Sequence, residues 1–249
     1  MIIIKNNKEI DLMRSAGKIV AETLLLIEEK VRPGITTAEL DRIAEEFITK
    51  HGAKPSFKGL YGFPASLCIS VNEQVVHGIP GGYVLKDGDI VSVDCGAKIN
   101  GFHGDAARTF GVGNITKEAE RLINVTEESF FKGIEYAKVG NRLTDISHEI
   151  QNCVEAAGFS VVRDFVGHGI GRVVHEDPDI PNYGRPGRGP KLVEGMALAI
   201  EPMVNVGNYK VKTLSNDWTV VTSDGSLSAH YENTIVILPD GPEILTLIR

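Results

Sequence analysis

The chain contains the run Gly88-Asp-Ile-Val-Ser-Val-Asp94, an apolar stretch that is typical of a buried strand and that ends in an acid. The pattern returns 107 positions later as Gly195-Met-Ala-Leu-Ala-Ile-Glu201. Chance recurrence of strand patterns would explain either run alone. Because helical patterns precede both runs in the same order, we favour an internal duplication. A pseudo-twofold axis would then bring the two terminal acids together at the centre of the fold.

The helical segments of the two halves match at an offset of 106 positions. A first helix is expected from Asn6, where Glu9 completes a capping-box pair, to about residue 31. Further helices are expected over about 37–50 and 117–137, and a last one follows Gly140 and ends at about 157. The matched positions are Gly34, Leu40, Ala44, Ile48 and Gly52 with Gly140, Ile146, Ile150, Val154 and Gly158. No linker separates the halves. We therefore expect a single domain over 1–249, duplicated at approximately 6–113 and 117–249.

Strand patterns alternate with these helices, which predicts the α/β (α+β) class. Strands are expected at about 68–76, 89–95, 103–110, 196–201, 218–222 and 228–238. A glycine-rich segment occupies 167–171, and the Pro- and Gly-rich residues 178–190 are expected to form a long loop.

Asp94 and Asp105 lie on a predicted hairpin centred on Asn100-Gly101. With the turn at that dipeptide, Asp94 faces Ala107, and Asp105 is a diagonal neighbour on the same face, at about 7–8 Å. Solvated acids near a turn are the ordinary alternative. However, Asp94 follows an apolar run in which unpaired charge is costly. Two carboxylates at this spacing can both reach a pair of metal ions about 3.5–4 Å apart.

Glu201 and Glu232 bring the number of acids attached to apolar strands to four. Burial of four mutually repelling carboxylates requires cations or protons between them. Structural salt bridges are the alternative, but they need basic partners in the same runs, where only Arg108 is a candidate.

Three histidines complete the candidate site. His168 lies between glycines, which allow the backbone to approach a ligand. His77 precedes Gly-Ile-Pro, and His175 precedes Glu-Asp-Pro. Satisfied or exposed histidines are more common than ligands, and we expect this ordinary state for His51, His103, His148 and His230. A site of mostly oxygen ligands with one imidazole suits Mn, Fe or Co.

The composition excludes several classes of function. The net charge is −7 without a block of basic residues, which argues against nucleic acid as the main ligand. No apolar stretch is long enough for a signal peptide or a membrane span. Three widely separated cysteines, Cys68, Cys95 and Cys153, fit a reducing compartment. We expect a soluble, cytoplasmic protein.

In combination and in order, these motifs resemble the type I methionine aminopeptidases of bacteria. The resemblance covers essentially the whole chain and rests on the segments 68–80, 88–94, 104–105, 167–171, 175–178, 199–203 and 230–234. It implies the pita-bread fold, in which two pseudo-twofold-related halves form a curved antiparallel sheet covered by helices. It also implies hydrolysis of the initiator Met from nascent proteins and peptides when the next residue is small.

The resemblance assigns the site residues as follows. Two divalent ions (Co, Mn or Fe) would activate water to hydroxide. Glu201 would accept the proton, His175 would stabilise the oxyanion, and His77 would contact the scissile amide. The metal ligands would be Asp94, Asp105, His168, Glu201 and Glu232.

The same resemblance places a pocket for the Met side chain at Phe63, Cys68 and Trp218. Phe57 and Leu60 are weaker candidates, and core packing is the alternative for each of these residues. Val174 departs from the family pattern, since many relatives have Phe there, which predicts a thinner or differently shaped pocket wall.

Two alternatives remain within the same fold. A prolidase or aminopeptidase P usually carries a separate N-terminal domain, and a non-catalytic binding module should lack at least one of the five ligands, all of which are present. The resemblance implies nascent chains as partners and proximity to the ribosome. We expect a monomer.

Overall fold

The structure is a computed structural model that describes residues 1–248. The helices are α1 (Asn7–Lys30), α2 (Thr37–Lys50), α3 (Lys117–Ile134) and α4 (Leu143–Ala156), with a short 3-10 helix at Leu60–Gly62. The strands are β1 (Lys54–Pro55), β2 (Leu67–Val71), β3 (Gln74–Val76), β4 (Ile90–Ile99), β5 (Phe102–Gly111), β6 (Ser160–Val161), β7 (Gly167–Gly169), β8 (Glu176–Ile180), β9 (Ala197–Ile200), β10 (Met203–Asn205), β11 (Val211–Thr213), β12 (Val220–Thr222), β13 (Ser228–His230), β14 (Asn233–Leu238) and β15 (Gly241–Ile244).

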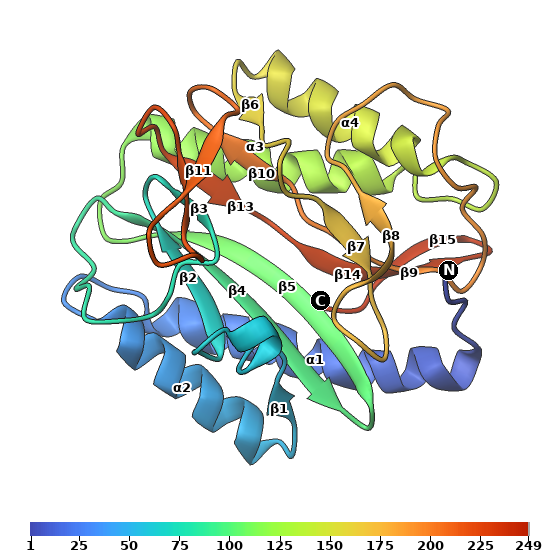
Figure 1. Ribbon diagram of the computed structural model, residues 1–249, viewed down its shortest axis with the longest axis horizontal. Coiled ribbons are helices and arrows are strands. Elements are labelled where there is room, and N and C mark those ends of the chain that lie inside the picture. The colour runs from blue at the N-terminus through green and yellow to red at the C-terminus, as the bar shows by residue number, and fades with distance from the viewer. Residues whose placement is uncertain (249) are drawn as a thin grey trace.

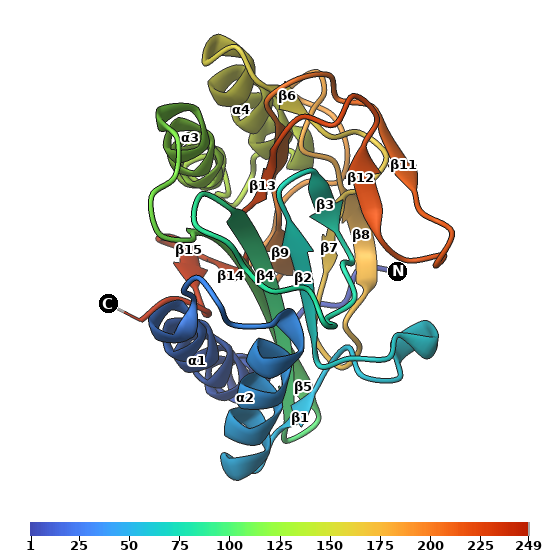
Figure 2. The same ribbon diagram turned by 90° about the vertical axis from the view of Figure 1, so that its left-hand side faces the viewer.

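All four helices lie on one side of a curved layer of strands. In Figure 1, α1 and α2 lie in the lower part of the view and α3 and α4 in the upper part. Figure 2 shows the helices together on the left and β8, β11 and β12 on the opposite side. All of the strand pairs are antiparallel. The helices therefore cover the convex side of the layer and leave its concave side to short strands and loops.

The first helix forms as its sequence predicts. The Asn6 side chain accepts a hydrogen bond from Glu9 N, and the Glu9 carboxylate accepts one from Asn6 N, both at 3.1 Å. This capping box satisfies two backbone donors that the first turn would otherwise leave unpaired. Ile10, Met13 and Val20 on the predicted apolar face are buried against the strands.

The β4–β5 hairpin has the predicted register. Ile99 pairs with Phe102 across the Asn100-Gly101 turn, and Asp94 pairs with Ala107. Both turn residues have left-handed φ angles, 53° and 85°, as a two-residue hairpin turn requires. The register therefore turns the side chains of Asp94 and Asp105 to the same face of the sheet.

The sheet formed by β1, β2, β4 and β5 meets the sheet formed by β7, β8, β9, β14 and β15 along β5 and the segment that leads into β14. Glu232 N donates to Ala107 O at 3.0 Å, and Asp105 N donates to the Thr234 hydroxyl at 3.0 Å. The same hydroxyl donates to Asp105 O at 2.9 Å. The seam between these two sheets thus passes through the backbones of Asp105 and Glu232, two of the predicted metal ligands.

Three expectations about strands were wrong. The segment 68–76 is broken into β2 and β3 by a turn at Asn72, whose φ is 56°. The segment 228–238 is broken at 231–232, so that β13 pairs with β10 and β14 pairs with β9. Residues 176–180, partly placed in a loop, form β8 against β7. In the first two cases pairing with distant strands decides the local structure, whereas β8 pairs with the preceding strand, β7.

None of the helices within residues 1–248 combines the length and the apolar character needed to cross a lipid bilayer.

Gly17 of α1 is expected to tolerate no side chain. A Cβ atom there would lie 2.2 Å from the backbone oxygen of Leu245, which cannot move away as a flexible side chain would. Gly17→Ala should therefore lower the free energy of unfolding by about 2 kcal/mol or more, although Ala is the better helix former. Urea denaturation measures this loss.

Gly82→Ala is the matched control for this substitution, because a Cβ atom at Gly82 would meet nothing within 4 Å. Equal stability of the two variants would contradict the packing described for α1.

Candidate metal centre

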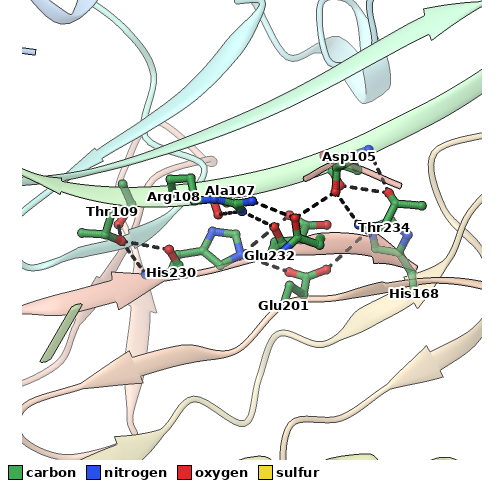
Figure 3. Close-up of polar contacts among 12 residues, drawn as sticks. Asp105, Ala107, Arg108, Thr109, His168, Glu201, His230, Glu232 and Thr234 are labelled. Atoms are coloured by element: carbon green, nitrogen blue, oxygen red, sulfur yellow. Dashed lines mark hydrogen bonds and ion pairs between the residues drawn. The ribbon is translucent and has the colours of Figure 1, made fainter. Parts of the chain in front are cut away.

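The five predicted metal ligands come from the sheet that contains β4 and β5 and from the sheet that contains β7, β9 and β14, and they line one cavity of about 250 Å³. Asp94 projects from β4, Asp105 from β5 and His168 from β7, while Glu201 follows β9 and Glu232 lies between β13 and β14. Ligand atoms of Asp105, His168 and Glu232 all lie within 4.8 Å of one another. Figure 3 shows Glu201 between His168 on one side and His230 on the other.

Several carboxylate oxygens in this cluster have no hydrogen-bond partner. Within residues 1–248, Asp94 Oδ1, Asp105 Oδ1 and Glu232 Oε1 are buried and unpaired. A buried polar atom without a partner costs about 1–3 kcal/mol, and more if it is charged. Three such oxygens at one point are an arrangement that bound cations would satisfy.

The protonation of the acids leads to the same conclusion. Burial raises the pKa of Asp94 to about 7. The pKa values of Asp105, Glu201 and Glu232 lie well above their usual range, first because of burial and then because of the negative charges of neighbouring acids. These groups can ionise together only if positive charge enters the cavity.

His168 presents a lone pair to the acids. Its Nδ1 lies 2.9 Å from Gly169 O, a pure acceptor, so Nδ1 carries the proton and Nε2 does not. The unprotonated Nε2 lies 3.5 Å from Glu201 Oε1. Burial, and then the nearby His175, lower the pKa of His168 to about 4, which keeps the ring neutral. A lone pair that faces a carboxylate oxygen is suited to sharing a cation with it.

The glycines beside His168 allow close packing of neighbouring strands, which is not the role expected for them. A Cβ atom at Gly167 would lie 2.4 Å from Ala199 O, and one at Gly169 would lie 2.0 Å from Asp177 O. The glycines therefore allow β7 to lie close to β9 and β8, whereas the sequence interpretation assigned them to the approach of a ligand.

The salt-bridge alternative fails for Arg108. Its guanidinium donates to the backbone oxygens of Ala107 and Glu232 at 2.7 and 2.6 Å and to the Asn233 side chain at 2.7 Å. It lies over the ring of Tyr231, 4.3 Å from the centroid. Among residues 1–248 it forms no ion pair with any of the four acids, so it holds the backbone of Glu232 and does not pair with the carboxylate.

His77 and His175 line the same cavity as the acids. His77 follows β3 with a left-handed φ of 58°, a strained conformation of the kind found at functional sites. His175 lies at the exposed mouth, with its ring centroid 4.5 Å from that of His168. Beside it, a buried ion pair between Lys5 and Glu176 anchors the start of β8. Burial lowers the pKa of both histidines, to about 4 for His77, so both rings are neutral donors near pH 7.

The predicted pocket residues gather at the apolar end of the cavity. Phe63 packs edge-on against Trp218 with centroids 5.1 Å apart, and Phe57, Leu60 and Cys68 complete the lining. Val174 is buried in the same apolar cluster, and the thinner pocket wall expected from it stays a prediction.

Two residues of the site were missed from the sequence. Tyr61 stacks on His175 at 5.8 Å, in a loop where its φ is 51°. The flanking Gly59 and Gly62 were the available signal for this conformation. His230 was expected to be satisfied or exposed, yet it is 2% exposed and its Nε2 has no hydrogen-bond partner within residues 1–248. By contrast, His103 is satisfied by Ser56 at 2.8 Å, as expected.

Comparison with known proteins agrees with this geometry. The model of metallopeptidase family M24 matches residues 11–239. A methionine aminopeptidase of Clostridium perfringens is 79% identical over 249 residues, covering 100% of both chains. The chain belongs to family M24 and, within it, to the methionine aminopeptidases. Methionine aminopeptidase 1 of Bacillus subtilis is 58% identical over 248 residues, again covering 100% of both chains.

A solved structure has the same fold. The methionine aminopeptidase of Rickettsia prowazekii superposes with a TM-score of 0.98 at 47% identity, covering 99% of this chain and 100% of that one. The pita-bread fold and the metalloaminopeptidase class expected from the sequence are confirmed.

The metal-free protein is expected to lose stability as the pH rises through 7, the value to which burial raises the pKa of Asp94, and on through the raised pKa values of the other three acids. Folded-state pKa values of Asp105, Glu201 and Glu232 are raised, so their protonated forms stabilise the fold at low pH, and this contribution is lost as the pH rises through those values. The histidines with lowered pKa values do not contribute to the change, because their effect is complete above an unfolded pKa of about 6.5.

The melting temperature in the presence of a chelator at pH 7, 8 and 9 measures this loss. Glu232→Gln removes one of the titrating acids, so its melting temperature should fall less than that of the parent. Parallel curves for the two proteins would count against the titration of a buried acidic cluster.

Proposed function

We propose that this chain releases N-terminal methionine from nascent proteins and peptides whose second residue is small. We further propose that Asp94, Asp105, His168, Glu201 and Glu232 hold two divalent cations for this reaction. The observation that carries the proposal is the position of unpaired buried carboxylate oxygens at one end of a cavity whose other end is apolar. One end is suited to cations and the other to an unbranched apolar side chain.

The donor set supports particular metals. Four carboxylates and one neutral imidazole are ligands that Mn, Fe and Co accept readily. When bound, a pair of such ions would supply a Lewis acid and lower the pKa of water toward neutrality. Cys68 does not compete as a thiolate ligand, because burial and then the charge of Asp94 raise the pKa of its thiol well above the usual value.

The residues around the donors have separate tasks in this proposal. Glu201 is the proton acceptor, since its carboxylate lies within the donor cluster, 3.5 Å from His168 Nε2, and lines the cavity where the substrate would bind. His77 and His175 are neutral imidazoles at the cavity wall, able to donate hydrogen bonds to the scissile amide and to the developing oxyanion. Phe63, Cys68 and Trp218 exclude water from the side chain of the substrate and fix its position.

The wider setting is also proposed. We expect one catalytic domain over residues 1–249 with an internal duplication at approximately 6–113 and 117–249. Asp94 and Asp105 from the first part and Glu201 from the second line the same cavity, which supports a shared site. Cytoplasmic location, a monomeric state and action near the ribosome remain predictions.

Peptide hydrolysis tests the proposed specificity. With Mn or Co added, the protein should release Met from Met-Ala-Ser and leave Xaa-Pro peptides intact. Cleavage confined to Xaa-Pro peptides would favour the prolidase alternative, and cleavage of neither would favour a non-catalytic module.

The ligand set is tested by Asp105→Asn and Glu232→Gln. Each change should lower kcat/KM for Met-Ala-Ser by more than about 100-fold, since loss of a direct ligand should exceed the 10–100-fold effect of outer-sphere partners. Asp240→Asn, on an exposed turn, is the matched control and should keep the parent activity. Circular dichroism verifies that the variants fold. Parent-like turnover in either ligand variant under controlled metal concentration would refute the assignment.

A further inference from the structure

His230 occupies a fixed position beside the acids. It ends β13, where the Thr109 hydroxyl donates to His230 O and accepts from His230 N, both at 2.9 Å. Because that hydroxyl has only one proton, the Ser92 hydroxyl 2.8 Å away must donate to it. The backbone of His230 is therefore held by a fully satisfied pair of buried hydroxyls, and its ring is directed by that anchor.

The ring points between two carboxylates. His230 Nε2 lies 3.8 Å from Glu201 Oε2 and 3.8 Å from Glu232 Oε2 (Figure 3). The side chain is 2% exposed, and within residues 1–248 this nitrogen has no hydrogen-bond partner. Native structures rarely leave a buried nitrogen unpaired without a functional reason.

The two glutamates present their other oxygens elsewhere. Glu201 Oε1 faces His168 Nε2 at 3.5 Å, and Glu232 Oε1 is buried and unpaired. Each carboxylate thus has one oxygen, Oε1, available to the ligand cluster and one, Oε2, directed at His230. A single donor at this position can orient both carboxylates.

The protons on the two histidines are arranged differently. Nδ1 of His168 gives its proton to Gly169 O, so its Nε2 offers a lone pair. No hydrogen bond within residues 1–248 involves Nδ1 of His230, so its Nε2 is free to carry the proton. An imidazole with a proton on Nε2 donates to carboxylates and does not bind a cation through that atom.

The geometry points to His230 as a positioning residue: its Nε2–H donates to Oε2 of Glu201 and Glu232 and so holds their Oε1 atoms toward bound cations. This inference rests on the metal ligands proposed above. The separation of 3.8 Å closes to hydrogen-bond range through a small rotation of the side chains. Partners of this kind fix ligand orientation at metal sites, and their loss costs about 10–100-fold in metal affinity.

Two variants of similar size separate donation from packing. His230→Leu fills the same space without a donor, whereas His230→Gln keeps an N–H group within reach of both oxygens. His51→Leu, at the exposed C-terminal end of α2, controls for the loss of a histidine elsewhere. Near-ultraviolet circular dichroism of the metal-free proteins verifies that all of them pack as the parent does.

Calorimetric titration with Mn(II) measures the effect. We expect the dissociation constant of His230→Leu to rise about 10–100-fold, and those of His230→Gln and His51→Leu to stay within about threefold of the parent. Electron spin-echo modulation of bound Mn(II) should show the same coordinated imidazole nitrogen in the parent and in both His230 variants.

Three outcomes would overturn the inference. Parent-like affinity in His230→Leu would mean that donation has no effect, and equal weakening in His230→Gln would mean that a donor cannot replace the ring. Loss of an imidazole coupling in His230→Gln would make His230 a ligand itself. Failure of the proposed ligand set has a separate signature, because the parent protein itself would then bind no Mn(II).

Discussion

Mutual repulsion among four carboxylates in one cavity, two of them fully buried (Asp105 and Glu232) and two partly buried (Asp94 and Glu201), is the constraint on which the rest of this structure depends. Asp94, Asp105, Glu201 and Glu232 are held beside one another in an apolar setting where each alone would resist ionisation. In water such groups would move apart. Here they are attached to paired strands, and moving any of them away would break backbone hydrogen bonds. The sheet therefore maintains a concentration of negative charge that folding by itself would not favour.

The fold resists that repulsion most directly at the seam between β5 and β14. The backbone of Asp105 is bound by the Thr234 hydroxyl, and the backbone of Glu232 by Ala107 and Arg108. All of these contacts bind main-chain atoms and leave the carboxylates themselves unpaired. Positioning and neutralisation are thus separated: the protein supplies the first and leaves the second to cations. This separation explains how the partly buried Arg108 can bind the backbone of Glu232 without forming an ion pair with the carboxylates.

Features that depend on local sequence could be predicted, and those that depend on distant contacts could not. The Asn100-Gly101 turn fixes the register of ten residue pairs, so the facing of Asp94 and Asp105 followed from a dipeptide. The breaks at Asn72 and at 231–232 could not be foreseen, because each half of a broken run pairs with a different distant strand. His230 was missed for the same reason. At a strand end beside Glu232, nothing local distinguishes a directed imidazole from an ordinary buried one.

The glycines around His168 show that a residue can lie in the predicted cavity for a different reason from the one predicted. Their spacing suggested that the backbone approaches a ligand, yet their small size serves the packing of β7 between β8 and β9. That packing is nevertheless what places the imidazole. With the backbone held so closely, Nδ1 donates to the carbonyl of Gly169, and Nε2 lies 3.5 Å from Glu201 Oε1. Close strand packing therefore positions the ring so that Nδ1 carries the proton. Because of this tautomer, His168 offers the lone pair of Nε2 where positive charge is needed.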